Sequence, residues 1–197
     1  LVYWGNLFSN KPIANEIWTA LGNTLIIAVI SAIVSTILGT LGAIGAFYSK
    51  KRSQKAIEIT TQIPVSNAEI VIALSLVVMF VFIGDRIFHA NLFSFWTLLV
   101  GHVVLGLPFV YLSVKPKLQQ MDPHLYEAAL DLGATPRQGL FQVIIPEVMP
   151  GILSGFLLSV TLSLDDFIVT AFTRGAGLLS GQKTIETLST LIQAKLK

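Results

Sequence analysis

Four apolar stretches divide this chain, at about residues 21–48, 59–83, 93–114 and 148–173. A helix needs about 20 apolar residues to cross roughly 30 Å of hydrocarbon, so each stretch is long enough to span a bilayer. The first is the clearest, because it contains no charged side chain. The pattern predicts an all-α, polytopic transmembrane helix bundle with four spans, which forms one domain over residues 1–197.

Composition favours a membrane protein over a soluble one. Charged residues make up 12% of the chain, against about 25% in an ordinary soluble domain, and the mean hydropathy is +0.74. The absence of Cys excludes disulfides, thiol catalysis and thiolate metal sites. The net charge of +2 gives no indication of nucleic-acid binding. No motif for a metal, a cofactor or an enzyme active site is present.

Basic residues between the apolar stretches set the expected orientation. They gather in the first and third connections, whereas the second contains only Arg86. Because cytoplasmic loops carry an excess of Lys and Arg, we expect the first and third connections to be cytoplasmic and both chain ends to lie outside. The residues concerned are Lys50, Lys51, Arg52, Lys55, Lys115, Lys117 and Arg137.

We expect the chain to be a piece of a longer subunit. It begins with Leu1 rather than Met, and its first residues show no signal-peptide pattern. Residues 185–197 have the pattern of a short amphipathic helix that could lead into a further span.

The third connection, residues 115–147, carries several helix signals. Asp122–Pro123 and Thr135–Pro136 each combine an N-cap side chain with a proline at the first helical position. Gly133 can adopt a positive φ and end the first helix, and Pro146 is expected to limit the second. The sequence therefore predicts two short helices that meet at a sharp bend on the cytoplasmic face.

The first of these helices has a mostly apolar face at helical spacing, made by Leu125, Ala128, Ala129 and Leu132. The two alanines make part of that face flat, so another protein could approach closely. From the residues alone, docking of a soluble partner and packing against the chain's own spans are equally good interpretations.

The same loop resembles the EAA loop of ABC importer permeases. Glu127-Ala128-Ala129 is followed after three residues by Gly133, and after nine more by Val143-Ile144-Ile145-Pro146. The family pattern is Glu-Ala-Ala, three residues, Gly, nine residues and Ile-x-Leu-Pro. The spacing agrees throughout, and the two departures, Val143 for Ile and Ile145 for Leu, conserve side-chain volume.

The resemblance implies a type I ABC importer permease fold, usually of six spans, in the cell inner (plasma) membrane. It implies that the loop docks on a separate ATP-binding subunit that hydrolyses ATP, so the chain itself is not an enzyme. A second permease subunit, like or unlike this one, and an extracellular or periplasmic substrate-binding protein are the other implied partners. The implied coupling residues are Glu127, Ala128, Ala129, Gly133 and Pro146.

Within that family the chain is most similar to the spermidine/putrescine transport permeases, specifically to those of the C type. The similar stretches are Leu162–Phe167, Thr173–Gly175 and Ile70–Ser75. Permeases for ferric iron, thiamine or other solutes share much of this pattern, so they stay alternatives.

Three carboxylates, Glu69, Asp165 and Asp166, lie in the predicted spans, where no Lys or Arg occurs. A carboxylate at mid-membrane costs roughly 2.5–3.5 kcal/mol on insertion scales, so it usually faces a cavity or a partner. We expect the three to line a path for a polycation. Alternatively, Asp165 and Asp166 cap a broken helix or pair with a basic group on a partner subunit. Pro64 is expected to begin or bend the second span.

Two rival functions belong to other classes. In an ion-coupled secondary transporter the three carboxylates would be proton or cation sites, but the cytoplasmic two-helix loop would have no purpose. A structural membrane subunit would assemble a complex and transport nothing.

Overall fold

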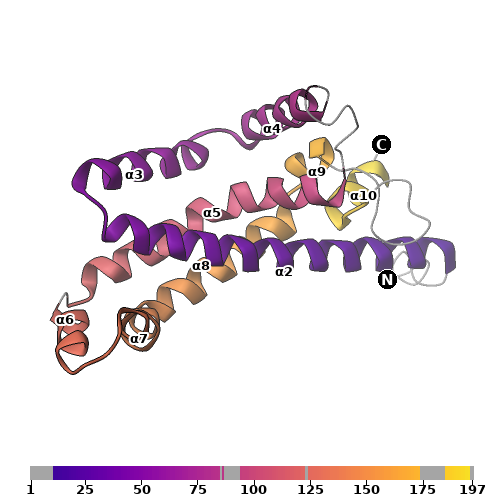
Figure 1. The fold of residues 1–197 in the computed structure, drawn as a ribbon. Coiled ribbons are helices and arrows are strands. Elements are labelled where there is room, and N and C mark those ends of the chain that lie inside the picture. Colours follow the sequence, from indigo (N-terminus) through magenta and orange to yellow (C-terminus); the bar gives the residue numbers. More distant parts are fainter. Residues whose placement is uncertain (1–10, 85, 87–93, 123, 174–184, 196–197) are drawn as a thin grey trace.

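The computed structural model describes residues 11–84, 86, 94–122, 124–173 and 185–195. Three long helices pack on one another and form the body of the fold (Figure 1). They are α2 (Lys11–Phe47), α5 (Phe95–Gln120) and α8 (Ile145–Asp165). In the described residues three helical segments are long and apolar enough to cross a membrane: Asn15–Phe47, Phe95–Gln120 and Pro136–Asp165.

The predicted second span, residues 59–83, is divided between two helices, α3 (Lys51–Ser66) and α4 (Glu69–Ile83). They pass the membrane-span test together but are bent by 109° at the break. Pro64 lies inside α3, so it neither begins the span nor marks the bend. The bend lies at Asn67 and Ala68, whose ψ angles of 150° and 138° are extended.

The third and fourth predicted spans also differ from the helices at their ends. α5 continues six residues beyond the predicted end at 114, to Gln120, and the predicted start at 93 lies outside the described residues. α8 ends at Asp165, and a separate short helix, α9 (Ile168–Thr173), follows the break. The tail forms α10 (Leu188–Lys195), which begins three residues later than the sequence indicated, and residues 196–197 lie outside the described residues. Residues 174–184 and most of the second connection lie outside the described residues.

The prediction that Pro146 ends a second short helix is wrong. α7 (Pro136–Gly139) continues through a π-helical turn, η2 (Leu140–Ile144), directly into α8. A proline inside an α-helix has no N–H and its ring clashes with the carbonyl four residues earlier. The π turn widens the helix just before the proline, where the Ile145 N–H bonds to the Leu140 carbonyl. The helix therefore runs through Pro146 without ending.

Small residues let the three long helices approach closely, as expected for helices that pack in a membrane. A Cβ atom at Gly39 would lie 2.8 Å from the Val110 side chain, and one at Gly155 would lie 2.9 Å from the Val110 Cα. Ser31 and Ser35 of α2 are fully buried. Gly42 and Gly45 of the same helix, by contrast, face open space.

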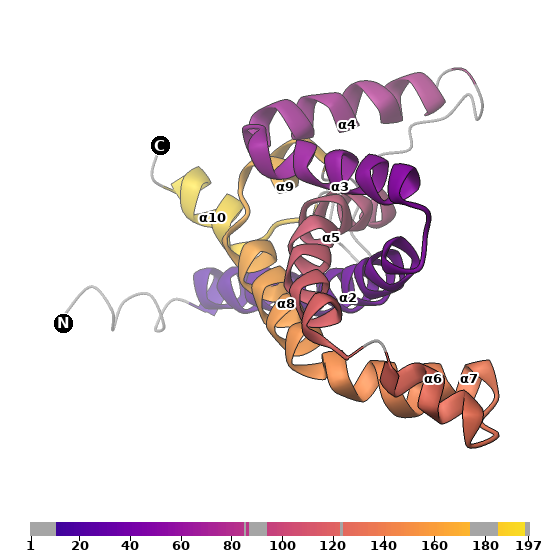
Figure 2. The same ribbon diagram turned by 90° about the vertical axis from the view of Figure 1, so that its left-hand side faces the viewer.

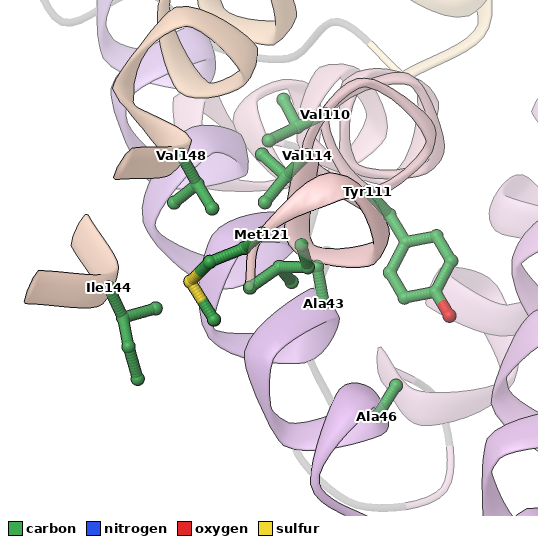
Figure 3. Packing of buried hydrophobic residues seen from close by; sticks show 9 residues of the cluster. Ala43, Ala46, Val110, Tyr111, Val114, Met121, Ile144 and Val148 are labelled. Carbon is green, nitrogen blue, oxygen red and sulfur yellow. The ribbon is translucent and has the colours of Figure 1, made fainter. Parts of the chain in front are cut away.

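A hydrophobic cluster closes the bundle near the end that carries the loop (Figure 3). In Figure 3 Val114, Met121 and Val148 converge beside Ala43 of α2. Leu118, Val110 and Val148 have no exposed surface. This cluster joins the extended end of α5 to the start of α8, so it positions the loop between them.

We predict that Gly155→Ala destabilises the protein, because its methyl group would meet the Val110 backbone rather than a movable side chain. The expected loss is about 1–3 kcal/mol, typical of overpacking, and would appear as a lower midpoint of thermal unfolding in detergent. Gly42→Ala is the matched control, because nothing lies within 4 Å of its added methyl group. Equal midpoints for the two variants would contradict the close packing.

Candidate functional site

The loop at one end of the bundle contains α6 (His124–Asp131), whose two ends are fixed by local hydrogen bonds. The Asp122 carboxylate accepts a hydrogen bond from the His124 N–H at 2.9 Å. This confirms the predicted N-cap, while Pro123 lies outside the described residues. At the other end Gly133 has a φ of 89°, as the sequence predicted.

Two backbone hydrogen bonds complete the corner after α6. The Gly133 N–H donates to the Leu130 carbonyl at 2.9 Å, and the Ala134 N–H donates to the Ala129 carbonyl at 3.0 Å. This pair of bonds is a Schellman motif, in which a left-handed glycine satisfies the last carbonyls of a helix. Thr135 then caps α7 in a reciprocal capping box with Gln138. The bend is therefore specified by side chains within the loop itself.

Tyr126 attaches α6 to the rest of the molecule. Its ring lies 5.9 Å from the ring of Tyr48, just beyond the end of α2. It also lies so close to Gly139 that a Cβ there would be 2.7 Å from the Tyr126 ring. Partial burial, and secondarily Tyr126, raise the pKa of Tyr48. The first and third connections therefore meet at the same end of the bundle, where Figure 2 shows α6 and α7 projecting from it.

The structure brings the five predicted coupling residues to this end. Glu127 and Ala128 are exposed on α6, Ala129 is half-buried, and Gly133 is exposed at the corner. Pro146 is exposed on the neighbouring long helix. The sequence analysis named Leu132 only as part of the apolar face of the first loop helix. In the structure 90% of its surface is exposed, which makes it the most exposed large apolar side chain of the loop. The loop does not pack entirely against its own spans.

The three membrane carboxylates gather around the break between α8 and α9. Glu69 is the first residue of α4, and α4 packs against α9. This packing brings Glu69 within electrostatic range of Asp165 and Asp166. Glu69 and Asp165 are exposed on the surface of the chain, whereas only 5% of Asp166 is exposed. The three carboxylates are therefore neighbours, but two are exposed on the surface of the chain and one is buried.

Asp166 caps α9. Its carboxylate accepts hydrogen bonds from the Val169 N–H at 3.2 Å, the Thr170 N–H at 2.9 Å and the Thr170 hydroxyl at 3.0 Å. These bonds satisfy the free amides at the start of the helix. The structure therefore has the helix-capping arrangement that was one alternative for this residue. Asp165, one residue earlier, is instead the last residue of α8.

His102 of α5 is buried beside this break, as expected of a hydrogen-bonded packing residue. Its Nδ1 lies 3.0 Å from the Ser163 hydroxyl, and its Nε2 lies 3.1 Å from the Thr170 hydroxyl and 3.8 Å from the Asp166 carboxylate. Ser31 of α2 donates to Ser163 at 3.3 Å. Sequence reasoning did not connect His102 with Asp166, because the two are far apart along the chain.

An ion pair that was not expected from the sequence holds α3 to α5. Lys115 of α5 donates a hydrogen bond to the Glu58 carboxylate of α3. Both lie toward the loop end of the bundle. In the part of the chain that the structure describes, no group of three or more His, Cys, Asp or Glu side chains is placed to hold a metal ion.

Two relatives of known type are similar over most of the chain. The spermidine/putrescine transport system permease protein PotC of Escherichia coli K12 is 33% identical over 172 residues, covering 87% of this chain and 62% of that protein. The putrescine transport system permease protein PotI of the same strain is 32% identical over 160 residues, covering 81% and 57%. The chain thus spans about 62% of the length of PotC.

A solved structure has the same fold. The crystal structure of an amino acid ABC transporter with histidines matches with a TM-score of 0.62 at 18% identity, covering 96% of this chain and 81% of that one. The family model described as binding-protein-dependent transport system inner membrane component matches residues 36–195. With several helices long enough to cross a bilayer, the chain is a multi-pass membrane protein. It belongs to the family of binding-protein-dependent transport system inner membrane components and has the type I permease fold.

Proposed function

We propose that this chain is the membrane-spanning part of an ATP-driven importer, and that α6 couples it to a separate ATP-hydrolysing subunit. The observation that carries this proposal is the α6 corner. It exposes Leu132 and Ala128 at the end of the bundle, while Tyr126 attaches it to Tyr48 and to Gly139 of α7. An exposed apolar side chain on a rigidly held helix is suited to a protein partner.

The mechanism follows from the continuous helix that begins at Pro136 and ends at Asp165. ATP binding closes the two ATPase subunits and displaces α6. Because the corner at Gly133 is fixed by hydrogen bonds, the displacement passes into this helix rather than being absorbed in a loose loop. The helix then tilts and moves the break at its far end, which opens the path to the other side of the membrane.

The remaining partners follow from the family. The path is shared with a second permease subunit, and a substrate-binding protein outside delivers the solute to it. The chain resides in the cell inner (plasma) membrane, with α6 on the cytoplasmic side, where the basic residues of the first and third connections also lie. ATP hydrolysis takes place on the ATP-binding partner.

The solute is a polyamine such as spermidine or putrescine. Two lines of support converge on this substrate class. The relatives named above are permeases of spermidine and putrescine transport systems. Independently, Glu69 and Asp165 present two exposed carboxylates near one another, and negative groups within a membrane attract a polycation.

Leu132→Asp in the complete transporter is expected to lower ATP-driven polyamine uptake at least tenfold, equal to roughly 1.4 kcal/mol of lost coupling or more. The reason is that docking would bury an unpaired carboxylate. Uptake into proteoliposomes and retention of the ATPase on the purified permease are the measurements.

Ser53→Asp is the matched control, because it adds the same charge to an exposed residue at the same end of the bundle, outside α6. It should leave uptake close to wild type. Full uptake by the Leu132→Asp transporter would show that α6 is not the docking surface.

The two neighbouring aspartates should respond differently to neutralisation. Asp165→Asn removes one exposed charge and should raise the KM for spermidine about fivefold, the equivalent of roughly 1 kcal/mol for a partly screened ion pair. Asp166→Asn weakens the cap of α9 and should lower the thermal midpoint of the permease, which Asp165→Asn should leave close to wild type. The measurements are uptake kinetics in proteoliposomes and thermal unfolding in detergent. Identical effects of the two substitutions on both quantities would contradict this division of roles.

A further inference from the structure

One buried side chain from α5 bonds to both limbs of the break between α8 and α9. The Nδ1 of His102 meets Ser163, two residues before the end of α8, and its Nε2 meets Thr170 in α9. Only 3% of the surface of His102 is exposed, so neither bond competes with solvent. The imidazole therefore fixes the two helices relative to each other.

The two limbs are not equally well held by other contacts. α8 packs along α2 and α5, and Ser163 is also bonded to Ser31 of α2. α9 has only six residues and packs on α4 and α5, and the Thr97 hydroxyl of α5 donates a hydrogen bond to the Thr173 carbonyl at the far end of α9 at 3.3 Å. The first turn of α9 is organised by the carboxylate of Asp166, which itself lies 3.8 Å from His102 Nε2. The bond from His102 therefore matters most for the placement of this first turn.

The angle at this break determines where the two exposed carboxylates lie. Asp165 is carried by the end of α8, whereas Glu69 is carried by α4, which packs against α9. A change in the angle between α8 and α9 would therefore move Glu69 relative to Asp165. For an extended polyamine, the distance between amino groups is fixed by the number of methylene carbons between them.

We propose that His102 is a positioning residue that sets the separation of Asp165 and Glu69, and with it the preference between a short diamine and a longer triamine. The proposal rests on polyamine uptake as the proposed function. His102 contacts no substrate, and it acts through Thr170 and Asp166.

Two substitutions test the contacts of the two imidazole nitrogens separately. The amide of His102→Gln reaches about as far as Nε2, so it keeps a polar group beside Thr170 and Asp166. The amide of His102→Asn reaches only about as far as Nδ1, so it keeps the bond to Ser163 and loses the hold on α9. If His102 had only a structural role, there would be no reason for His102→Gln to preserve the position of α9 better than His102→Asn does.

The first measurement is uptake of labelled putrescine and spermidine by the complete transporter in proteoliposomes. We expect His102→Asn to change the ratio of the two KM values at least about fivefold, the scale of one lost buried hydrogen bond, and His102→Gln to stay within about twofold of wild type. An unchanged ratio in His102→Asn, with wild-type uptake intact, would overturn the inference and leave the proposed function standing. Absence of polyamine uptake by the wild type would overturn both.

The second measurement uses no polyamine. Spin labels are placed at Leu157→Cys on α8 and Val78→Cys on α4, in a complete transporter whose other parts have had any cysteines replaced. These 197 residues contain no Cys of their own, and both positions are well exposed on this chain. The distance between the labels should be narrow in the wild type and in His102→Gln, and shifted or broadened in His102→Asn. An unchanged distance in His102→Asn would overturn the inference.

Thr170→Val keeps the test decisive if His102→Asn does not assemble. It removes the α9 hydroxyl that meets both His102 and Asp166, keeps the Thr170 N–H bond to Asp166, and leaves α5 untouched and the side-chain volume nearly the same. The same shifts in label distance and in KM ratio are expected. Wild-type values for both in Thr170→Val would refute the role of His102.

Discussion

The structure depends on the close contact between α2, α5 and α8. Between helices in a membrane no hydrophobic effect drives association, so packing at short range and hydrogen bonds between helices must hold them. Both occur at one level of this bundle, where Gly106 leaves room for the hydroxyls of Ser35 and Ser159. Because the backbones approach so closely there, His102 of α5 can reach Ser163 on α8, and Ser31 of α2 can reach the same hydroxyl. The polar network at the helix break is thus a consequence of small residues elsewhere.

A second constraint follows from the helix that passes through Pro146. A break at that proline would have separated the loop from the membrane span and left a flexible joint between them. The π turn at Leu140–Ile144 instead keeps one helix from Pro136 to Asp165, which at 1.5 Å per residue extends about 45 Å. π turns of this kind are often found at functional sites. Here the turn preserves a stiff connection between the corner at Gly133 and the break beside the carboxylates.

Features of the fold that depend on neighbouring residues could be predicted from the sequence, whereas features that depend on contacts between distant segments could not. The apolar stretches, the cap at Asp122, the positive φ of Gly133 and the cap at Thr135 all depend on residues within one or two turns. The bend between α3 and α4 depends on how those helices pack on α5 and α9, so Pro64 was a misleading signal. Pro146 misled for a related reason, because a proline shows where a helix must adjust but not whether it ends.

Asp165 and Asp166 show the same limit at the candidate site. In the sequence they are one doubled charge in an apolar span, and nothing local distinguishes them. In the structure the first ends α8 and faces outward, and the second turns inward because α9 begins there and needs an acceptor for its free amides. A buried carboxylate is tolerable only with several such donors. The inner aspartate thus stabilises the break that presents the outer one, so an effect of replacing both together could not be assigned to substrate contact alone.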